Sequence, residues 1–155
     1  MIKTYLLYIL SIFSFSFPLL AKPIDIFFGT GGRGSQGIYY ATFNPENGKF
    51  TPSKLAAEIG SPGFLTTHPD GKILYSLGRW DGGSGALGYH IGPKGELKEF
   101  TRMACPDGGG AHIAIHPSGK FLLTAQYGGG SVAMFPLDKE GNLQTPTVIE
   151  HQGGS

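Results

Sequence analysis

The stretch that decides the fold runs from Gly110 to Leu137 and reads GAHIAIHPSGKFLLTAQYGGGSVAMFPL. Two turns divide it into three short apolar runs: an HPSGK turn that begins at His116, and a glycine turn over residues 128–130. In such turns Pro presets φ at one position, and Gly accepts a positive φ at another. Each run has the length of a strand and is too short for a helix. The stretch therefore predicts an antiparallel up-and-down meander.

This meander has an earlier copy in the chain. An HPDGK turn begins at His68, and the HPSGK turn begins at His116, which gives a period of 48 (116 minus 68). A second marker, a Gly followed two residues later by an apolar residue, recurs at Gly48, Gly95 and Gly141, with spacings of 47 and 46. Four-stranded repeats of roughly 40–50 residues are typical of β-propeller blades. The sequence predicts an all-β fold, a partial β-propeller of about three four-stranded blades.

The start of the chain has the pattern of an export signal. Lys3 supplies a positive charge, the segment from Tyr5 to Phe17 carries no charge, and a small residue, Ala21, stands at the end. We expect residues 1–21 to be a signal peptide and residues 22–155 to form the propeller domain, in an exported protein that is periplasmic or secreted and free of the membrane after cleavage. An uncleaved membrane anchor is the alternative.

The number of repeats does not suffice for a closed ring. Removing 21 of 155 residues leaves 134, slightly less than three units of about 47 residues. Propellers close with four or more blades, and an open array leaves two apolar sheet faces without a neighbour. We therefore expect the chain to be the N-terminal part of a longer protein, with self-assembly of short chains as the alternative.

Composition excludes several classes of function. Twelve Lys and Arg residues stand against eleven Asp and Glu, so the net charge of +1 gives no electrostatic basis for binding nucleic acid. Cys105 is the only cysteine, which excludes an intrachain disulfide. Residues 29–34 match the G-x-G-x-x-G dinucleotide pattern, but an aromatic strand pattern follows where that site needs a helix. We predict a hairpin loop there, and we predict no cofactor and no metal.

Two histidines are candidate catalytic residues. His112 interrupts an apolar run at the point where the previous unit has Phe64 or a neighbour. The innermost strand of each propeller blade lines the central channel, so an imidazole at this point is either a site residue or a packed, hydrogen-bonded histidine. His151 stands in a polar loop before Gly153 and Gly154, and its role is open.

Three further residues are candidates for substrate binding. Gln126 and Tyr127 directly precede the glycine turn of the third unit, where an amide and a phenol could donate to a polyol or lactone. Arg79 has a similar place in the second unit and could bind an anionic group. The alternatives are a loose hairpin turn for the first two and a solvated side chain for Arg79.

These segments resemble the seven-bladed propeller lactonase family, whose name-giving activity is 6-phosphogluconolactonase. The run from Ala125 to Val132, AQYGGGSV, and the Gly-rich end after His151 are the more specific matches. The likeness covers nearly all of the chain after residue 21 but only the first three of seven blades. Two departures stand out. Gln126 occupies a position where family members usually have Asn, and the chain ends before an Arg-Gln and a Pro-His-x-His segment. If those later residues complete the site, this piece is inactive.

The resemblance implies that the full-length protein is a monomeric hydrolase that opens a sugar or organic-acid lactone. His112 or His151 would then be the general base, and Arg79, Gln126 and Tyr127 would hold the substrate. An export signal favours a lactone other than a phosphorylated cytosolic intermediate. Two alternatives stay open: a non-catalytic exported propeller that binds a carbohydrate or a protein, and a lactone-forming enzyme like the muconate cycloisomerases.

Overall fold

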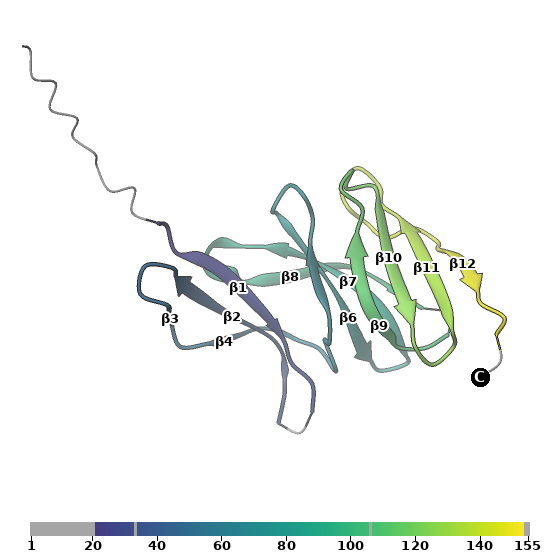
Figure 1. Ribbon diagram of the computed structural model, residues 1–155, viewed down its shortest axis with the longest axis horizontal. Helices are drawn as coiled ribbons and strands as arrows, with labels where there is room; N and C mark the ends of the chain where they lie inside the picture. Colours follow the sequence, from purple (N-terminus) through teal and green to yellow (C-terminus); the bar gives the residue numbers. More distant parts are fainter. Residues whose placement is uncertain (1–20, 33, 106, 154–155) are drawn as a thin grey trace, which may run out of the picture.

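The computed structural model describes residues 21–32, 34–105 and 107–153, so the predicted signal peptide lies almost wholly outside the described residues. The described chain is made of strands, turns and one 3-10 turn over Pro93–Gly95. Figure 1 shows the strands gathered into separate sheets that follow one another along the molecule. The prediction of an all-β fold is therefore confirmed. Within the described residues, no helix has the length and apolar character needed to cross a membrane.

Three antiparallel sheets of four strands each match the three predicted units. The second sheet has the order β5-β6-β7-β8 and the third has the order β12-β11-β10-β9, so in both the first strand of the unit lies at one edge. The strands of the second sheet are β5 (Leu65–Thr67), β6 (Ile73–Trp80), β7 (Gly83–Ile91) and β8 (Leu97–Ala104). Those of the third are β9 (Gly110–Ile115), β10 (Phe121–Gln126), β11 (Ser131–Pro136) and β12 (Thr147–Glu150).

The first sheet departs from this plan. Its strands are β1 (Ile24–Gly29), β2 (Gly37–Asn44), β3 (Lys49–Phe50) and β4 (Lys54–Glu58). Both β3 and β4 pair with β2, on the edge opposite β1. The four strands therefore occupy three positions across the sheet. The loop after β1, which carries the glycine pattern, joins β1 and β2 as a hairpin, as predicted.

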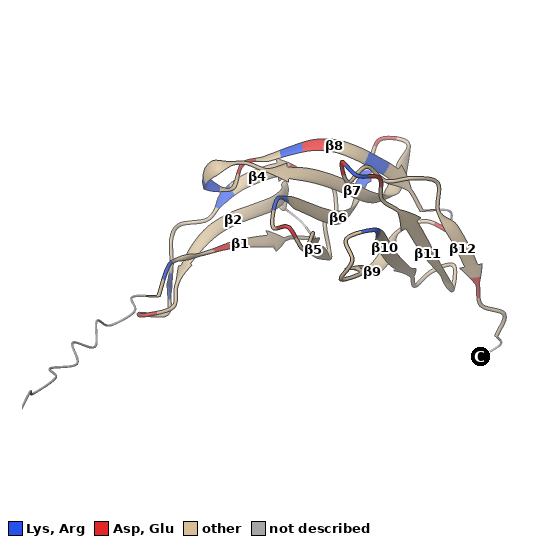
Figure 2. Ribbon diagram, turned by 90° about the horizontal axis from the view of Figure 1, so that it is seen from above, with Lys and Arg blue, Asp and Glu red and all other residues tan. Residues whose placement is uncertain are grey.

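The sheets are arranged as an arc. Seen from above in Figure 2, β8 lies on the convex side, and β5 and β9 lie on the concave side. β5 contacts β9 directly. The first strands of the second and third units thus line the inner surface, which is where a propeller has its channel.

Two apolar clusters hold the three sheets together, and β6 contributes to both. One face of β6 packs Leu74 against Ile38 of the first sheet, and the other packs Tyr75 and Leu77 into a cluster with Leu122 and Phe135 of the third. Because β6 is covered on both faces, residues 73–78 are all buried, which explains why this part of the sequence is apolar apart from Ser76 and Gly78.

Polar contacts reinforce the junction between the second and third sheets. The buried hydroxyl of Tyr75 donates to the carbonyl oxygen of Gly141 at 2.7 Å. The Nε2 of His68 lies 3.2 Å from the carbonyl oxygen of Gly119, which belongs to the equivalent turn of the next unit. The repeated His-Pro-x-Gly turn thus serves the joint between units, in agreement with its interpretation as a structural turn.

The outward faces of the two end sheets are apolar and open. Phe28 and Phe50 are exposed on the first sheet, and Phe121, Leu123 and Ile149 are exposed on the third. The expected pair of apolar sheet faces is therefore present. Such faces are typical of blades that stack against a neighbour on either side.

Candidate functional site

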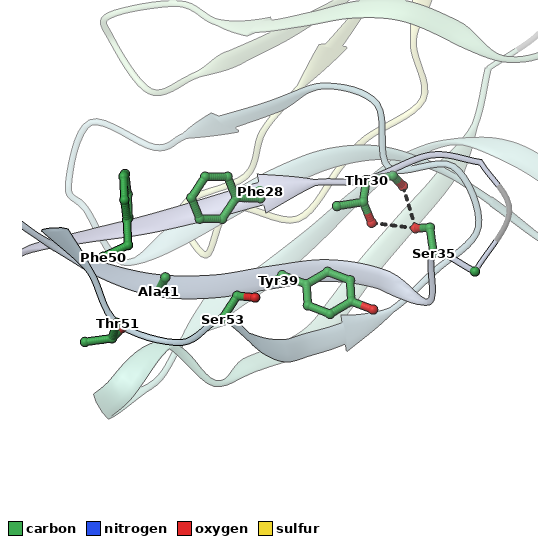
Figure 3. Close-up of a pocket in the computed structure, with 9 residues that line it drawn as sticks. Phe28, Thr30, Ser35, Tyr39, Ala41, Phe50, Thr51 and Ser53 are labelled. Atoms are coloured by element: carbon green, nitrogen blue, oxygen red, sulfur yellow. Dashed lines mark hydrogen bonds between the residues drawn. The ribbon is translucent and has the colours of Figure 1, made fainter.

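One hollow of the described residues lies on the open face of the first sheet. It has a volume of about 620 Å³, and Figure 3 shows aromatic rings and small side chains along it. The hydroxyl of Thr30 donates to the carbonyl oxygen of Gly37 at 2.6 Å and adjoins the hydroxyl of Ser35, so these polar groups already have partners. The lining residues are Phe28, Thr30, Gly34, Ser35, Tyr39, Ala41, Phe50, Thr51 and Ser53. This hollow is part of the apolar outward face.

A smaller hollow, of about 120 Å³, lies where the second sheet meets the third. It is lined by Ser61, Leu77, Gly78, Arg79, Gly109 and Gly110. Near it lie the segments 59–64 and 107–109 and the turns at 80–83 and 127–130, which together we call the loop rim. This rim brings together polar groups from two consecutive units.

Arg79 is fixed at the loop rim by its backbone. Its N–H donates to the carbonyl oxygen of Gly60 at 2.7 Å, and its own carbonyl accepts from the N–H of Gly60 at 3.1 Å. The guanidinium lies over the segment before β9, because a Cβ built on Gly109 would be 3.6 Å from Nη2. Among the described residues, no carboxylate forms an ion pair with this exposed cation. Arg79 can therefore attract an anionic or strongly polar group.

His112 lies at the start of β9, on the inner side of the arc. It is opposite Ala125 in the pairing of β9 with β10, and its side chain is exposed. Its ring contacts Phe64 of the previous unit, with ring centroids 5.1 Å apart. Gly109 and Gly110, which line the hollow under Arg79, precede it by two or three residues. His112 therefore lies two residues along β9 from the hollow under Arg79, on the same face of the third sheet as the exposed Ala125.

Gln126 lies inside the third sheet, away from any open site. Its side chain is 2% exposed. In the amide orientation that satisfies all its neighbours, Nε2 donates to the carbonyl oxygens of Thr124 and Ser131, and Oε1 accepts from the Thr124 hydroxyl at 2.6 Å. All of the close partners of this amide are thus internal. Gln126 stabilises the end of β10 where its pairing with β9 shifts at a bulge.

Tyr127 lies at the loop rim, whereas His151 lies at the outer edge of the third sheet. Tyr127, next to Gln126, is 91% exposed, so its hydroxyl is available at the loop rim. His151 follows β12 and donates its backbone N–H to Gly130 at 3.2 Å. Because β12 is three strand positions from β9, His151 lies about 14 Å from the strand of His112, at roughly 4.8 Å per strand. The structure does not bring the two predicted histidines together.

The chain matches a known protein family over nearly all of its described residues. Residues 25–155 match the model of the family described as Lactonase, 7-bladed beta-propeller. The chain belongs to this family. The resemblance seen in the sequence is therefore confirmed.

Individual relatives are similar to the chain over one part of their length. The 6-phosphogluconolactonase of Bacillus subtilis (strain 168) is 34% identical over 73% of this chain and 33% of its own length. A putative 6-phosphogluconolactonase from Bacteroides fragilis has a TM-score of 0.75 at 28% identity, over 84% of this chain and 37% of its own. A periplasmic gluconolactonase from Pseudomonas aeruginosa has a TM-score of 0.76 at 25% identity, over 84% and 39%. The chain spans about a third of the length of the curated relatives that it matches.

Phe64 also lies in this region, and its apolar side chain gave no indication of a functional role in the sequence. It lies at the inner edge of the second unit, one turn-to-turn period before His112. Subtracting the 48-residue period of the turns from His112 gives the position of Phe64. Aromatic residues in a repeat are ordinarily assigned to the core, but the side chain of Phe64 is 47% exposed.

Proposed function

We propose that the protein containing this chain opens the ring of a sugar or organic-acid lactone by hydrolysis. The observation that carries the proposal is the position of His112, an exposed imidazole on an inner strand that contacts the previous unit through Phe64, in a chain of the lactonase family. The family name alone would not assign a site, because one fold hosts many activities. His112 supplies a base, and Arg79 supplies a cation at the hollow beside the start of the same strand.

The proposed chemistry uses His112 as general base. A neutral imidazole takes a proton from water as the water oxygen adds to the lactone carbonyl carbon, because histidine titrates near neutral pH. The carbonyl oxygen then carries negative charge, which fixed donors stabilise. When the ring C–O bond breaks, the leaving alkoxide oxygen takes a proton from the imidazolium. The products are a hydroxy acid and the regenerated base.

The other predicted residues have smaller parts in this proposal. Arg79 attracts an anionic or polar substituent of the substrate, and Tyr127 offers a phenol at the rim. Gln126 holds the strand end that carries Tyr127. His151 has no part, since it lies on the outer side of the third sheet.

The substrate class is tested with the complete gene product on a panel of lactones. We expect ring opening of glucono-1,5-lactone and related aldonolactones faster than spontaneous hydrolysis, measured as acid release at constant pH. A phosphorylated gluconolactone belongs in the same panel, because curated relatives are named for it while a structural relative is named a periplasmic gluconolactonase. A purified, folded protein that accelerates none of these reactions would contradict the proposal.

A further inference from the structure

We infer that Phe64 is a positioning residue that fixes the orientation of the His112 imidazole. The inference rests on the proposed role of His112 as the base. It concerns the inner ends of β5 and β9, where two consecutive units place their equivalent side chains against each other.

The equivalence of the two positions follows from backbone register. The N–H of Leu77 donates to the carbonyl oxygen of Phe64 at 3.1 Å, and His112 is opposite Ala125. Both members of the second pair lie one turn-to-turn period after the members of the first. Since β5 and β9 are in contact, the two side chains lie side by side at the same level of the arc.

The ring contact is of the kind that orients a side chain. The centroids are 5.1 Å apart and the planes are tilted by 57°. Aromatic pairs favour tilted arrangements with centroids between about 4.5 and 7 Å, because the edge of one ring meets the face of the other. A ring held in this way has fewer accessible rotamers than an isolated exposed one.

His112 differs from two other histidines in what holds its ring. His68 has its ring nitrogens near Asp70 and Gly119, and the Nδ1 of His116 is 2.8 Å from the hydroxyl of Ser118. Within the described ranges, no side chain or backbone group forms a hydrogen bond with the ring of His112. The contact with Phe64 therefore takes the place of the hydrogen bond that usually orients an imidazole, and it leaves both ring nitrogens free for water and substrate.

Phe64 also has no evident role in packing. Its side chain is 47% exposed, and it belongs to neither of the two apolar clusters between the sheets. A large aromatic residue at this exposed position is explained by its contact with His112.

The test compares Phe64→Leu and Phe64→Tyr in the complete gene product on the lactone that it turns over fastest. Phe64→Leu removes the ring, and we expect kcat to fall about tenfold with KM within about twofold, because a misplaced base slows the chemical step. Phe64→Tyr keeps the ring and should retain at least about half of the wild-type kcat. The matched control is Phe121→Leu, which removes the ring that meets His116 edge-on, with centroids 6.2 Å apart, and should leave kcat unchanged.

A second readout does not depend on activity. The ring protons of His112 should show a ring-current shift in the NMR spectrum that Phe64→Leu abolishes and Phe121→Leu preserves. An unchanged His112 spectrum in Phe64→Leu overturns the inference even if that variant is too unstable for kinetics.

The outcomes separate this inference from the proposed function. If His112→Ala abolishes turnover while Phe64→Leu keeps the wild-type kcat, positioning by Phe64 is refuted and the proposed function stands. If Phe64→Leu raises KM and leaves kcat unchanged, Phe64 binds substrate directly and the inference is also refuted. If His112→Ala keeps full turnover, the proposed role of His112 fails first, and the inference fails with it.

Discussion

Two buried tyrosines of the second sheet should differ in how loss of the hydroxyl oxygen changes the stability of the protein. Tyr75 and Tyr89 are 0% and 1% exposed. The hydroxyl of Tyr75 donates to the Gly141 carbonyl at 2.7 Å across the junction with the third sheet. The hydroxyl of Tyr89 has no hydrogen-bond partner among the described residues, although Ser76 adjoins it. One phenol therefore connects two sheets, and the other is buried without compensation.

The expected magnitudes follow from this difference. Tyr75→Phe leaves a buried carbonyl without its donor, which costs about 1–3 kcal/mol of the free energy of unfolding. Tyr89→Phe removes an unsatisfied buried hydroxyl, so it should be neutral or stabilise the protein by up to about 1 kcal/mol. The two variants should thus differ by at least about 1 kcal/mol, although they carry the same substitution in one sheet.

Urea unfolding of the complete gene product measures this difference. The midpoint should fall for Tyr75→Phe and stay or rise for Tyr89→Phe, with the denaturant slope unchanged in both, so that midpoints report stability. Equal destabilisation by the two variants would refute the reasoning, because it would mean that the contact with Gly141 contributes nothing specific to the junction.

Two further outcomes follow from the same packing. Burial raises the pKa of Tyr89 to about 12 and raises the pKa of Tyr75 as well. The stability that these two neutral phenols contribute is complete below pH 10. It is lost as pH rises from there through the folded-state pKa values, at up to about 1.4 kcal/mol per pH unit for each tyrosine. Unfolding curves at alkaline pH should show this loss, and a free energy of unfolding that is constant from pH 9 to 12 would contradict it. In the repeated turns, Gly119→Ala should destabilise more than Gly71→Ala. Both glycines have φ near +70°, but only at Gly119 would the new Cβ meet the His68 ring, 2.5 Å from Nε2. Thermal melting of the two variants measures the difference. Equal losses of stability would mean that the contact between His68 and Gly119 does not stabilise the junction.

The sequence was sufficient for the fold because the fold repeats. The His-Pro-x-Gly turns at His68 and His116 fixed the period, and short apolar runs between turns have few alternatives to antiparallel strands. The arrangement of the first sheet was not predictable in this way. Its outer edge is shared by β3 and β4, with a break between Phe50 and Lys54, and the third unit has a similar break between the Leu137–Leu143 bridge and β12.

The positions of the candidate residues in the fold could be predicted only in part. The period places Arg79 and His112 in consecutive units, and their strands β6 and β9 are in contact. Gln126 was predicted to face a ligand, but alternation along β10 puts it on the buried face with Leu122 and Thr124. Counting in twos from Leu122 would have shown this. The separation of His151 from His112 depends on the order of strands in the third sheet, which motif spacing alone does not contain.

The most direct measurement of the central claim is the rate of lactone ring opening by the complete gene product with His112 replaced by Ala, compared with His116→Ala. The two histidines are four residues apart and both exposed, but His116 lies in the turn at the opposite end of β9. We predict that His112→Ala lowers kcat at least about tenfold while the protein stays folded, as expected for loss of a general base, and that His116→Ala keeps the wild-type rate. Equal rates for wild type and a folded His112→Ala variant would contradict the account.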